Sequence, residues 1–191
     1  MKPIYLYIVI LWWLCIACEF GKQGSNEQMY DDSTFTDNAV VLNDYSTIVQ
    51  DVILKEQGVV RGFNFGDTVL LVQDRERADL LEDSLKDRGF ITYTFKLDDE
   101  NKMVDIRYLF DESNRIEGFL VDIYHDEIKQ LSEDFTAFFD DRYGTGVTSD
   151  QSRLWESQRG FLVELSKQQS DIDAASGIQI RFILPDGSLN K

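Results

Sequence analysis

Three consecutive segments of this 191-residue chain alternate apolar and polar residues, and this alternation limits the possible folds more than any other feature. The segments cover residues 90–97, 103–110 and 115–124. Strict alternation is typical of an antiparallel sheet that has one dry face and one wet face. The two connections are short and rich in turn-forming residues, so we expect the three strands to form a meander.

Helical and strand patterns flank this meander. Apolar residues at helical spacing predict helices over residues 43–58, 67–89 and 126–144. A fully charged stretch at 74–77 leaves open whether the second helix is one helix or two. Further strands are predicted over residues 153–158, 160–167 and 177–184. We therefore expect an α+β fold, a largely antiparallel sheet with helices packed on one face, in which an αβββ pattern occurs twice.

The N-terminus has the pattern of a secretory signal. Lys2 is followed by an apolar stretch that runs from Ile4 to Cys18 and ends at Glu19. A membrane-spanning helix needs about 20 apolar residues to cross ~30 Å of hydrocarbon. The stretch is shorter than this, which disfavours the alternative of an uncleaved anchor helix.

The end of the apolar stretch, Leu14-Cys15-Ile16-Ala17-Cys18, resembles the lipobox of bacterial lipoproteins. Ala17 and Cys18 match the family pattern, whereas Cys15 stands where the family usually has leucine. The resemblance implies cleavage before Cys18, diacylglycerol on its thiol and acylation of the new amino terminus. Several acyl chains hold a protein stably on a membrane, whereas one does not. Because Glu19 follows Cys18 in place of aspartate, the resemblance favours the outer membrane in a host that has one.

The lipobox and the composition together predict the organisation of the chain. The segment after Cys18 lacks an apolar period and is rich in Gly, Ser, Asn and Asp, as expected of a flexible tether. The rest of the chain is long enough for one domain. We predict a signal peptide at residues 1–17, a tether at 18–38, a single α+β domain at 39–187 and a tail at 188–191.

Charge and cysteine content exclude several classes of function. Loss of Lys2 with the signal peptide would leave 18 basic residues against 35 acidic ones, a net charge of −17. Such a surface repels nucleic acids and anionic lipid headgroups, so membrane contact must come from the acyl chains. The only two cysteines are Cys15 and Cys18, and the first is lost on cleavage. Disulfides, thiol catalysis, cysteine-ligated zinc and iron–sulfur clusters are therefore not expected.

No pattern in the sequence predicts a catalytic, metal or cofactor site. The single histidine, His125, lies between a predicted strand and a predicted helix, where a junction or capping role is more common than general-base catalysis. Paired carboxylates, such as those at Asp98 and Asp140, fall in predicted turns or at a helix end, as solvated charges do. The glycines at 144 and 146 end a helix and do not begin one, so they are not a phosphate loop.

Two features are candidates for binding. Trp155 is the only tryptophan after the signal peptide; tryptophan is enriched in binding hot spots, but on a strand covered by helices it is more often a core residue. The wet face of the predicted sheet is the second candidate. It is expected to carry Thr92, Thr94, Lys96, Asp105, Arg107, Glu164, Gln179 and Arg181.

The segment from Arg61 to Thr68, which leads into a helix and the meander, resembles in its layout two groups of small periplasmic modules. These are the SmpA/BamE lipoproteins and the β-lactamase-inhibitor-like domains, and the resemblance covers residues 61–124. It implies a protein-binding module. We therefore expect a non-catalytic, membrane-anchored cell-envelope lipoprotein that binds another protein. The alternative is a surface hydrolase or small-ligand-binding lipoprotein, which requires His125 with a carboxylate partner, or converging carboxylates, in a deep pocket.

Overall fold

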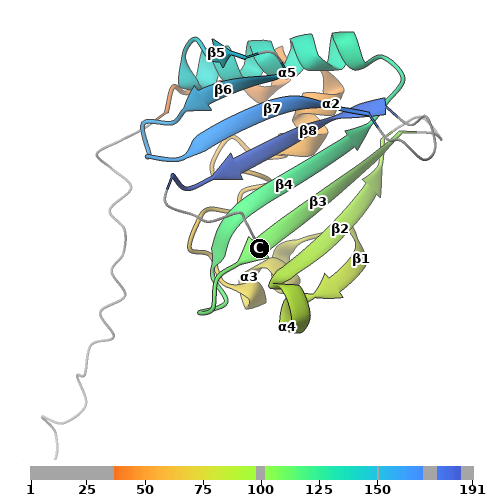
Figure 1. The fold of residues 1–191 in the computed structure, drawn as a ribbon, viewed down its shortest axis with the longest axis vertical. Coiled ribbons are helices and arrows are strands. Elements are labelled where there is room, and N and C mark those ends of the chain that lie inside the picture. The colour runs from red at the N-terminus through yellow and green to blue at the C-terminus, as the bar shows by residue number, and fades with distance from the viewer. Residues whose placement is uncertain (1–36, 98–101, 150, 170–175, 186–191) are drawn as a thin grey trace, which may run out of the picture. The chain divides into compact units, whose positions relative to one another are not determined.

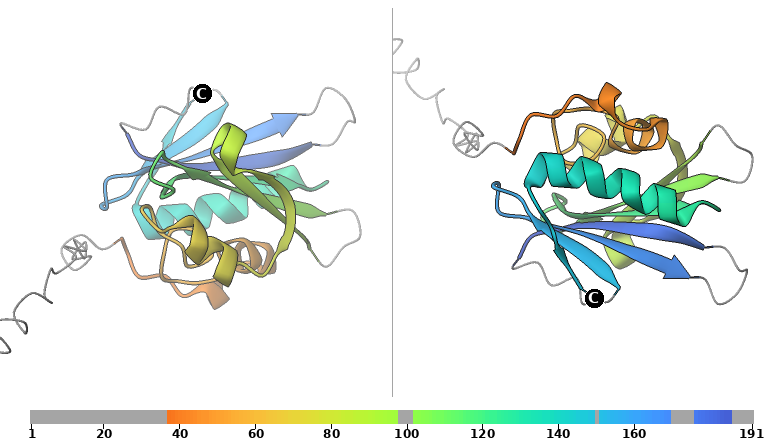
Figure 2. Two further views of the ribbon diagram at one scale, coloured as in Figure 1. Left: turned by 90° about the horizontal axis from the view of Figure 1, so that it is seen from below. Right: turned by 90° about the horizontal axis from the view of Figure 1, so that it is seen from above.

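A computed structural model describes residues 37–97, 102–149, 151–169 and 176–185. The predicted signal peptide, Cys18, most of the predicted tether and the predicted tail lie outside these ranges. Eight strands form one antiparallel sheet in the order β1-β2-β3-β4-β8-β7-β6-β5, with the helices on one side (Figures 1 and 2). The α+β prediction is confirmed.

The predicted meander is confirmed in detail. β2 (Phe90–Lys96), β3 (Met103–Phe110) and β4 (Ile116–Tyr124) pair in sequence order. On β3 the alternation is visible in the burial, because Val104, Ile106 and Tyr108 are fully covered while the residues between them are not. The apolar period of the sequence therefore indicates both the strands and the side of the sheet that faces the core.

The sheet consists of two halves that meet at its centre. β1 (Asp79–Ser84) to β4 form one half, and β5 (Val147–Thr148), β6 (Ser152–Glu156), β7 (Leu162–Gln169) and β8 (Ser176–Ile183) form the other. β4 pairs with β8 at the junction. Each half therefore has four strands, not the three that the sequence predicted. The two missed strands are the outermost ones, β1 and β5.

Of the two alternatives for residues 67–89, one helix or two, the structure has two short helices, and the prediction is wrong for the strand that lies between them. α3 (Val69–Arg75) begins after Thr68, whose hydroxyl accepts the amide of Leu71, and the chain then forms β1 and the single turn α4 (Leu85–Arg88). The break follows from Glu76, whose carboxylate accepts the amides of residues 77 and 78. This local bond offers the backbone an alternative to the next helical turn.

The first predicted helix is shorter than expected. A 3-10 turn, η1 (Leu42–Asp44), is followed by α2 (Thr47–Ile53). The helix ends at Ile53 because Leu54 has a φ of 62°, before residue 58, where the predicted helix ended. The predicted apolar face is confirmed, because Val49, Val52 and Ile53 are buried.

The long helix α5 (Ile128–Tyr143) lies against the inner face of the sheet and is covered by α2 on its other side (Figure 2). Its predicted apolar face is confirmed, since Leu131, Phe135, Phe138 and Phe139 are buried. The Phe139 ring lies 5.1 Å from the Trp155 ring on β6. The core is therefore a layer of aromatic and aliphatic side chains between β2–β8 and the helices.

Two residues that the sequence analysis assigned to the tether are fixed to the domain. Asp37 accepts hydrogen bonds from the Ser157 hydroxyl at 2.6 Å and from the amide of Gln158. The amide of Asn38 donates to the carbonyl of Arg142 at 3.0 Å. The chain therefore enters the domain beside the end of α5 and the β6–β7 turn. Within the described residues, no helix is both long and apolar enough to cross a membrane.

Candidate functional site

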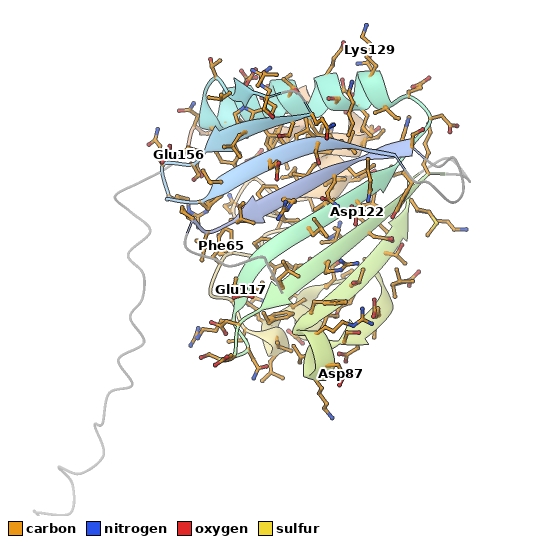
Figure 3. The ribbon with its side chains drawn as sticks, viewed as in Figure 1. Phe65, Asp87, Glu117, Asp122, Lys129 and Glu156 are labelled. Atoms are coloured by element: carbon orange, nitrogen blue, oxygen red, sulfur yellow. The ribbon has the colours of Figure 1, made fainter. Side chains whose placement is uncertain are left out.

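The side of the sheet opposite α2, α3 and α5, which we call the open face, is covered by none of these three helices, and Arg88 of α4 lies over Phe90 at its edge (Figures 2 and 3). The strand register arranges its side chains in rows that run across the strands, because register partners point to the same side. One row, the polar row, consists of Asp79, Thr94, Asp105, Asp122, Gln179, Ser166 and Ser152. Another, the apolar row, consists of Phe90, Leu109, Gly118, Ile183 and Leu162.

The register places all eight predicted wet-face residues on the open face. The prediction is wrong for Thr92 in one respect, since its side chain is only 2% exposed. The cause is Arg107, which lies beside it in register and donates to the Thr92 hydroxyl at 3.4 Å. The Arg107 guanidinium also lies 4.7 Å from the centre of the Phe90 ring. Arg107 thus covers both side chains.

The centre of the polar row holds two carboxylates side by side. Asp105 on β3 and Asp122 on β4 are direct register partners, and Asp122 is only 8% exposed (Figure 3). Gln179 donates to Asp122 at 2.8 Å. Burial raises the pKa of Asp122, and the charge of Asp105 raises it further, against the opposing effects of Gln179 and Arg107. Like charges directly opposite each other destabilise a sheet, so the two carboxylates are an unfavourable arrangement in the isolated protein.

Two polar atoms of the same row are also left without partners. The Thr94 hydroxyl and one carboxylate oxygen of Asp105 are buried and have no hydrogen-bond partner within the part of the chain that the structure describes. These residues are register neighbours, so the two atoms belong to one stretch of the row. Buried polar atoms in folded proteins usually have partners. The Thr94 hydroxyl can donate or accept, so the Asp105 oxygen is the one of these two atoms that specifically requires a donor.

We expect Asp122→Asn to raise the free energy of unfolding at pH 7 by up to about 1 kcal/mol. The asparagine keeps the acceptor for Gln179 and removes the charge that burial and Asp105 disfavour. Because the folded-state pKa of Asp122 is raised above the ordinary 3.8, the wild type is penalised only where the residue is ionised. The difference should therefore disappear below that pH and grow as the pH rises through the raised pKa. Urea unfolding from pH 3 to 7 measures it, with the exposed Asp87→Asn as the control. A loss of stability in Asp122→Asn at pH 7 would contradict the prediction.

The apolar row gives one part of the open face an apolar surface. Leu109 and Gly118 are in direct contact, since a Cβ atom on Gly118 would lie 3.1 Å from a methyl carbon of Leu109. Leu109, Ile183 and Leu162 are partly exposed, and Phe90 is buried beneath Arg88 and Arg107. A continuous apolar strip across five strands is a feature of surfaces that bind other molecules.

The arginines of the open face are bound to groups on that same face. Arg181 pairs with Glu164 at 3.2 Å. Arg107 lies over Phe90 and Thr92, as described above. In the row between the polar and apolar rows, Arg181 is therefore paired with Glu164, and Arg107 covers Phe90 and Thr92. The Asp105 carboxylate has no ion-pair partner within the described residues.

The other predicted binding candidate, Trp155, is a core residue, as expected. It is 2% exposed, and its indole nitrogen donates to Asp140 at 2.8 Å. Asp140 also accepts from Arg153 at 2.8 Å. The prediction that Asp140 is merely a solvated charge is therefore wrong. This aspartate joins α5 to β6, while Asp98 lies outside the described residues.

His125 lies at the junction of β4 and α5, between a strand and a helix as its position suggested. It is 5% exposed, and its Nδ1 accepts the amide of Glu127 at 2.9 Å, immediately before α5 begins. The bond fixes the ring to the backbone of the junction, whereas the residue that precedes α5 makes no side-chain cap hydrogen bond. The described residues also contain no group of three or more His, Cys, Asp or Glu side chains that could hold a metal ion.

The structure contains a buried ion pair that the sequence analysis did not find. Arg61 and Glu76 contact each other at 2.9 Å with both side chains at most 8% exposed, and Tyr108 donates to Glu76 at 2.5 Å. Hydrogen bonds from Arg61 and Tyr108 outweigh burial and lower the pKa of Glu76. Burial and the charge of Glu76 hold the pKa of Tyr108 well above its usual range. The group lies on the inner side of the sheet and has a structural role, because every one of these atoms bonds within the core.

A groove of about 890 Å³ runs between the first turns of α5 and strands β5–β8. Its lining is dominated by hydroxyl and amide side chains, among them Ser132, Thr136, Ser166 and Gln168. It is broad and open, and Lys167 and Arg153 also contribute to it. No carboxylate belongs to the described lining, so the convergent carboxylates required for a hydrolase are not found there.

Known proteins give no further guide to the site. Neither the known protein families, nor the curated proteins, nor the solved structures contain a significant match to this chain. The open face combines a polar row with two adjacent carboxylates, a parallel apolar row and a sheet surface that α2, α3 and α5 leave uncovered.

Proposed function

We propose that this protein is a non-catalytic lipoprotein of the cell envelope, anchored through Cys18, whose domain binds another protein with the open face of its sheet. The observation that carries the proposal is the composition of that face. Asp105 and Asp122 repel each other in the middle of it, and polar atoms beside them have no partners. An arrangement that is unfavourable in the free domain becomes favourable when a partner supplies donors and positive charge.

The lipobox supports the anchoring part of the proposal. Residues 19–36 separate Cys18 from the first described residue. An outer-membrane location is favoured where the host has two membranes.

Cys18→Ser is expected to move the protein from the membrane fraction to the soluble fraction. Serine cannot carry the thioether-linked lipid, and the net charge of −17 after cleavage gives no attraction to anionic lipids. Fractionation of cells after a high-salt wash measures the change. Cys15→Leu, which restores the usual lipobox residue, is the matched control and should remain with the membranes. A Cys18→Ser protein that stays in the washed membrane fraction would show that the anchoring proposal is wrong.

The binding part is tested by cross-linking in living cells. A photo-reactive amino acid is placed at Met103 or Leu154, which are 37% and 38% exposed on the open face. The matched positions are Lys129 and Glu133 on the exposed side of α5. We expect one discrete cross-linked protein, identified by mass spectrometry, from the open-face positions only. Equal products from both sides of the domain, or none from either, would count against the proposal.

A small-ligand receptor is the second candidate, and the groove beside α5 is the observation that favours it. Hydroxyl and amide groups such as Thr136 and Gln168 suit a neutral polar ligand, with Lys167 at the rim. The two proposals predict different effects of substitution. Thr136→Val and Gln168→Leu should abolish the binding of a small ligand, and they should leave open-face cross-links unchanged.

A further inference from the structure

We propose that the open face is built to receive a cationic, amphipathic α-helix that lies across the strands, with its apolar side on the apolar row and its basic side on the polar row. This inference rests on the proposed function and specifies the chemistry of the partner. It is carried by the simultaneous presence of the two rows, not by the carboxylates alone. Each row runs perpendicular to the strands, which is the direction in which the occupant must lie.

The dimensions of the face fit a helix. The two rows are four residues apart along each strand, which corresponds to roughly 13 Å. A helix with its side chains has a diameter of about 10–12 Å, so its two flanks reach both rows at once. The apolar row crosses five strands, or about 19 Å between its first and last members. A helix of roughly 13 residues covers that length.

The charges of the face select a basic occupant. Asp105 and Asp122 lie at the middle of the polar row, and Asp79 continues it on β1. The described arginines between the rows offset this acidity only in part, because Arg181 binds Glu164, while the charge of Arg107, whose guanidinium lies over Phe90 and Thr92, lowers the pKa of Asp122. A lysine or arginine placed over Asp105 would reduce the repulsion between Asp105 and its register partner Asp122.

The apolar row selects an amphipathic occupant over a simply basic one. Leu109, Ile183 and Leu162 offer an apolar strip, which ends beside Glu156 of β6, the register partner of Leu162. A highly charged basic segment would cover these side chains without burying them in apolar contact. The acidic row also disfavours an anionic lipid surface, which would bring phosphate against Asp105 and Asp122. The acidic polar row therefore favours a basic helix over an anionic membrane surface.

The test uses the full chain in nanodiscs of uncharged phosphatidylcholine, with empty nanodiscs as the reference. Three labelled 18-residue peptides serve as probes: a Leu/Lys helix with separate apolar and basic sides, the same helix with Glu for Lys, and a scrambled Leu/Lys peptide. Fluorescence anisotropy gives the Kd of each. We expect the amphipathic Leu/Lys helix to bind about tenfold or more tightly than either of the others. Equal affinity for the Glu peptide or the scrambled peptide would overturn the proposal.

Substitutions then locate the site. Asp105→Asn with Asp122→Asn should weaken binding of the Leu/Lys helix about tenfold and reduce its salt dependence, since two charge contacts are lost. Leu109→Ser with Leu162→Ser should weaken it without changing the salt dependence. The matched control is Asp74→Asn with Asp87→Asn, exposed aspartates on α3 and α4, and should leave the Kd within about twofold. If the control pair weakens binding as much as Asp105→Asn with Asp122→Asn, the attraction is general and the proposed site is wrong.

The peptide test and the cross-linking test fail in different ways. If open-face positions cross-link to one protein in cells but none of the peptides binds, the helix proposal is wrong and the binding function stands. If a peptide binds as expected but cross-links arise equally from α5, the face has the stated chemistry and the proposed function is wrong. Lipid-dependent binding is measured by adding anionic vesicles without peptide. Binding to these vesicles that requires Asp105 and Asp122 would overturn the proposal.

Discussion

Glu76→Gln is expected to lower the free energy of unfolding by about 3–5 kcal/mol, the usual effect of removing one partner from a buried ion pair. Arg61 would keep its charge at 8% exposure without the carboxylate that neutralises it. One carboxylate oxygen of Glu76 accepts from the amides of residues 77 and 78, and the other accepts from Tyr108. A glutamine side chain has only one acceptor oxygen. Its NH2 group would therefore lie against either the two backbone amides or the Tyr108 hydroxyl, which all donate to Glu76 in the wild type.

The pH dependence provides a second test of the same change. The pKa of Glu76 is lowered below its ordinary value of 4.5, so its contribution is fully present above that pH and is lost as the pH falls through the lowered pKa. Acid should therefore destabilise the wild type more than Glu76→Gln. Urea unfolding between pH 3 and 7 measures both effects.

The control for Glu76→Gln is the same substitution in a surface pair. Glu82 binds Arg88 at 3.1 Å with side chains 38% and 66% exposed, and such pairs contribute at most about 1 kcal/mol. Tyr108→Phe, which removes one bond to the carboxylate, should fall between the two. An equal loss for Glu76→Gln and Glu82→Gln would show that the buried pair has no special role.

Gly146→Ala is expected to destabilise the protein by about 1–3 kcal/mol through overpacking. A Cβ atom there would lie 2.6 Å from the indole nitrogen of Trp155. Trp155 cannot move away easily, because it packs on Phe139 and donates to Asp140. The backbone of Gly146 does not have a positive φ, so the effect comes from this contact and not from backbone strain.

Two further variants separate contact from strain for Gly146. Gly160 has a φ of +84° and open space around it, so Gly160→Ala reports backbone strain alone. The smaller ring of Trp155→Phe should reduce the effect of adding Gly146→Ala. Trp155 is the only tryptophan after the signal peptide. In the Gly146→Ala protein that retains Trp155, tryptophan fluorescence therefore reports the displacement of its ring directly. An unchanged effect of Gly146→Ala in the presence of Trp155→Phe would contradict the steric explanation.

The sequence predicts the strands whose apolar residues alternate and misses those without such a period. β2, β3 and β4 were identified from this alternation, although burial alternates strictly only on β3, and the first four residues of β2 are all buried. β1 was assigned to a helix because Ala78, Leu81 and Leu85 fall at helical spacing, and hydrogen bonds to β2 make the mostly exposed Asp79–Ser84 a strand. β5 has two residues, which is too short for any period. Pairing with a neighbour formed these two strands against their local sequence.

The sequence predicted which residues lie on the open face, but not which of them are neighbours across the strands. Alternation shows which residues share a face, and it correctly grouped Asp105 with Arg107 and Gln179. It does not give the register between strands, so the contact of Asp105 with Asp122 and the continuous apolar row could not be foreseen. The buried pair of Arg61 and Glu76 was missed for a similar reason, since the two residues come from segments that no sequence period connects.

The order of the strands has a consequence for the nascent chain. β4 is complete early in synthesis, but its partner β8 is the last strand of the sheet to be made. Until then, the edge of β4 has free backbone donors and acceptors beside the apolar residues of the first half. Such edges recruit other strands. A chain released before Ser176 would therefore leave the edge of β4 permanently unpaired. We expect this protein to be most prone to aggregate when synthesis stalls, or proteolysis cuts the chain, within α5 or β5–β7.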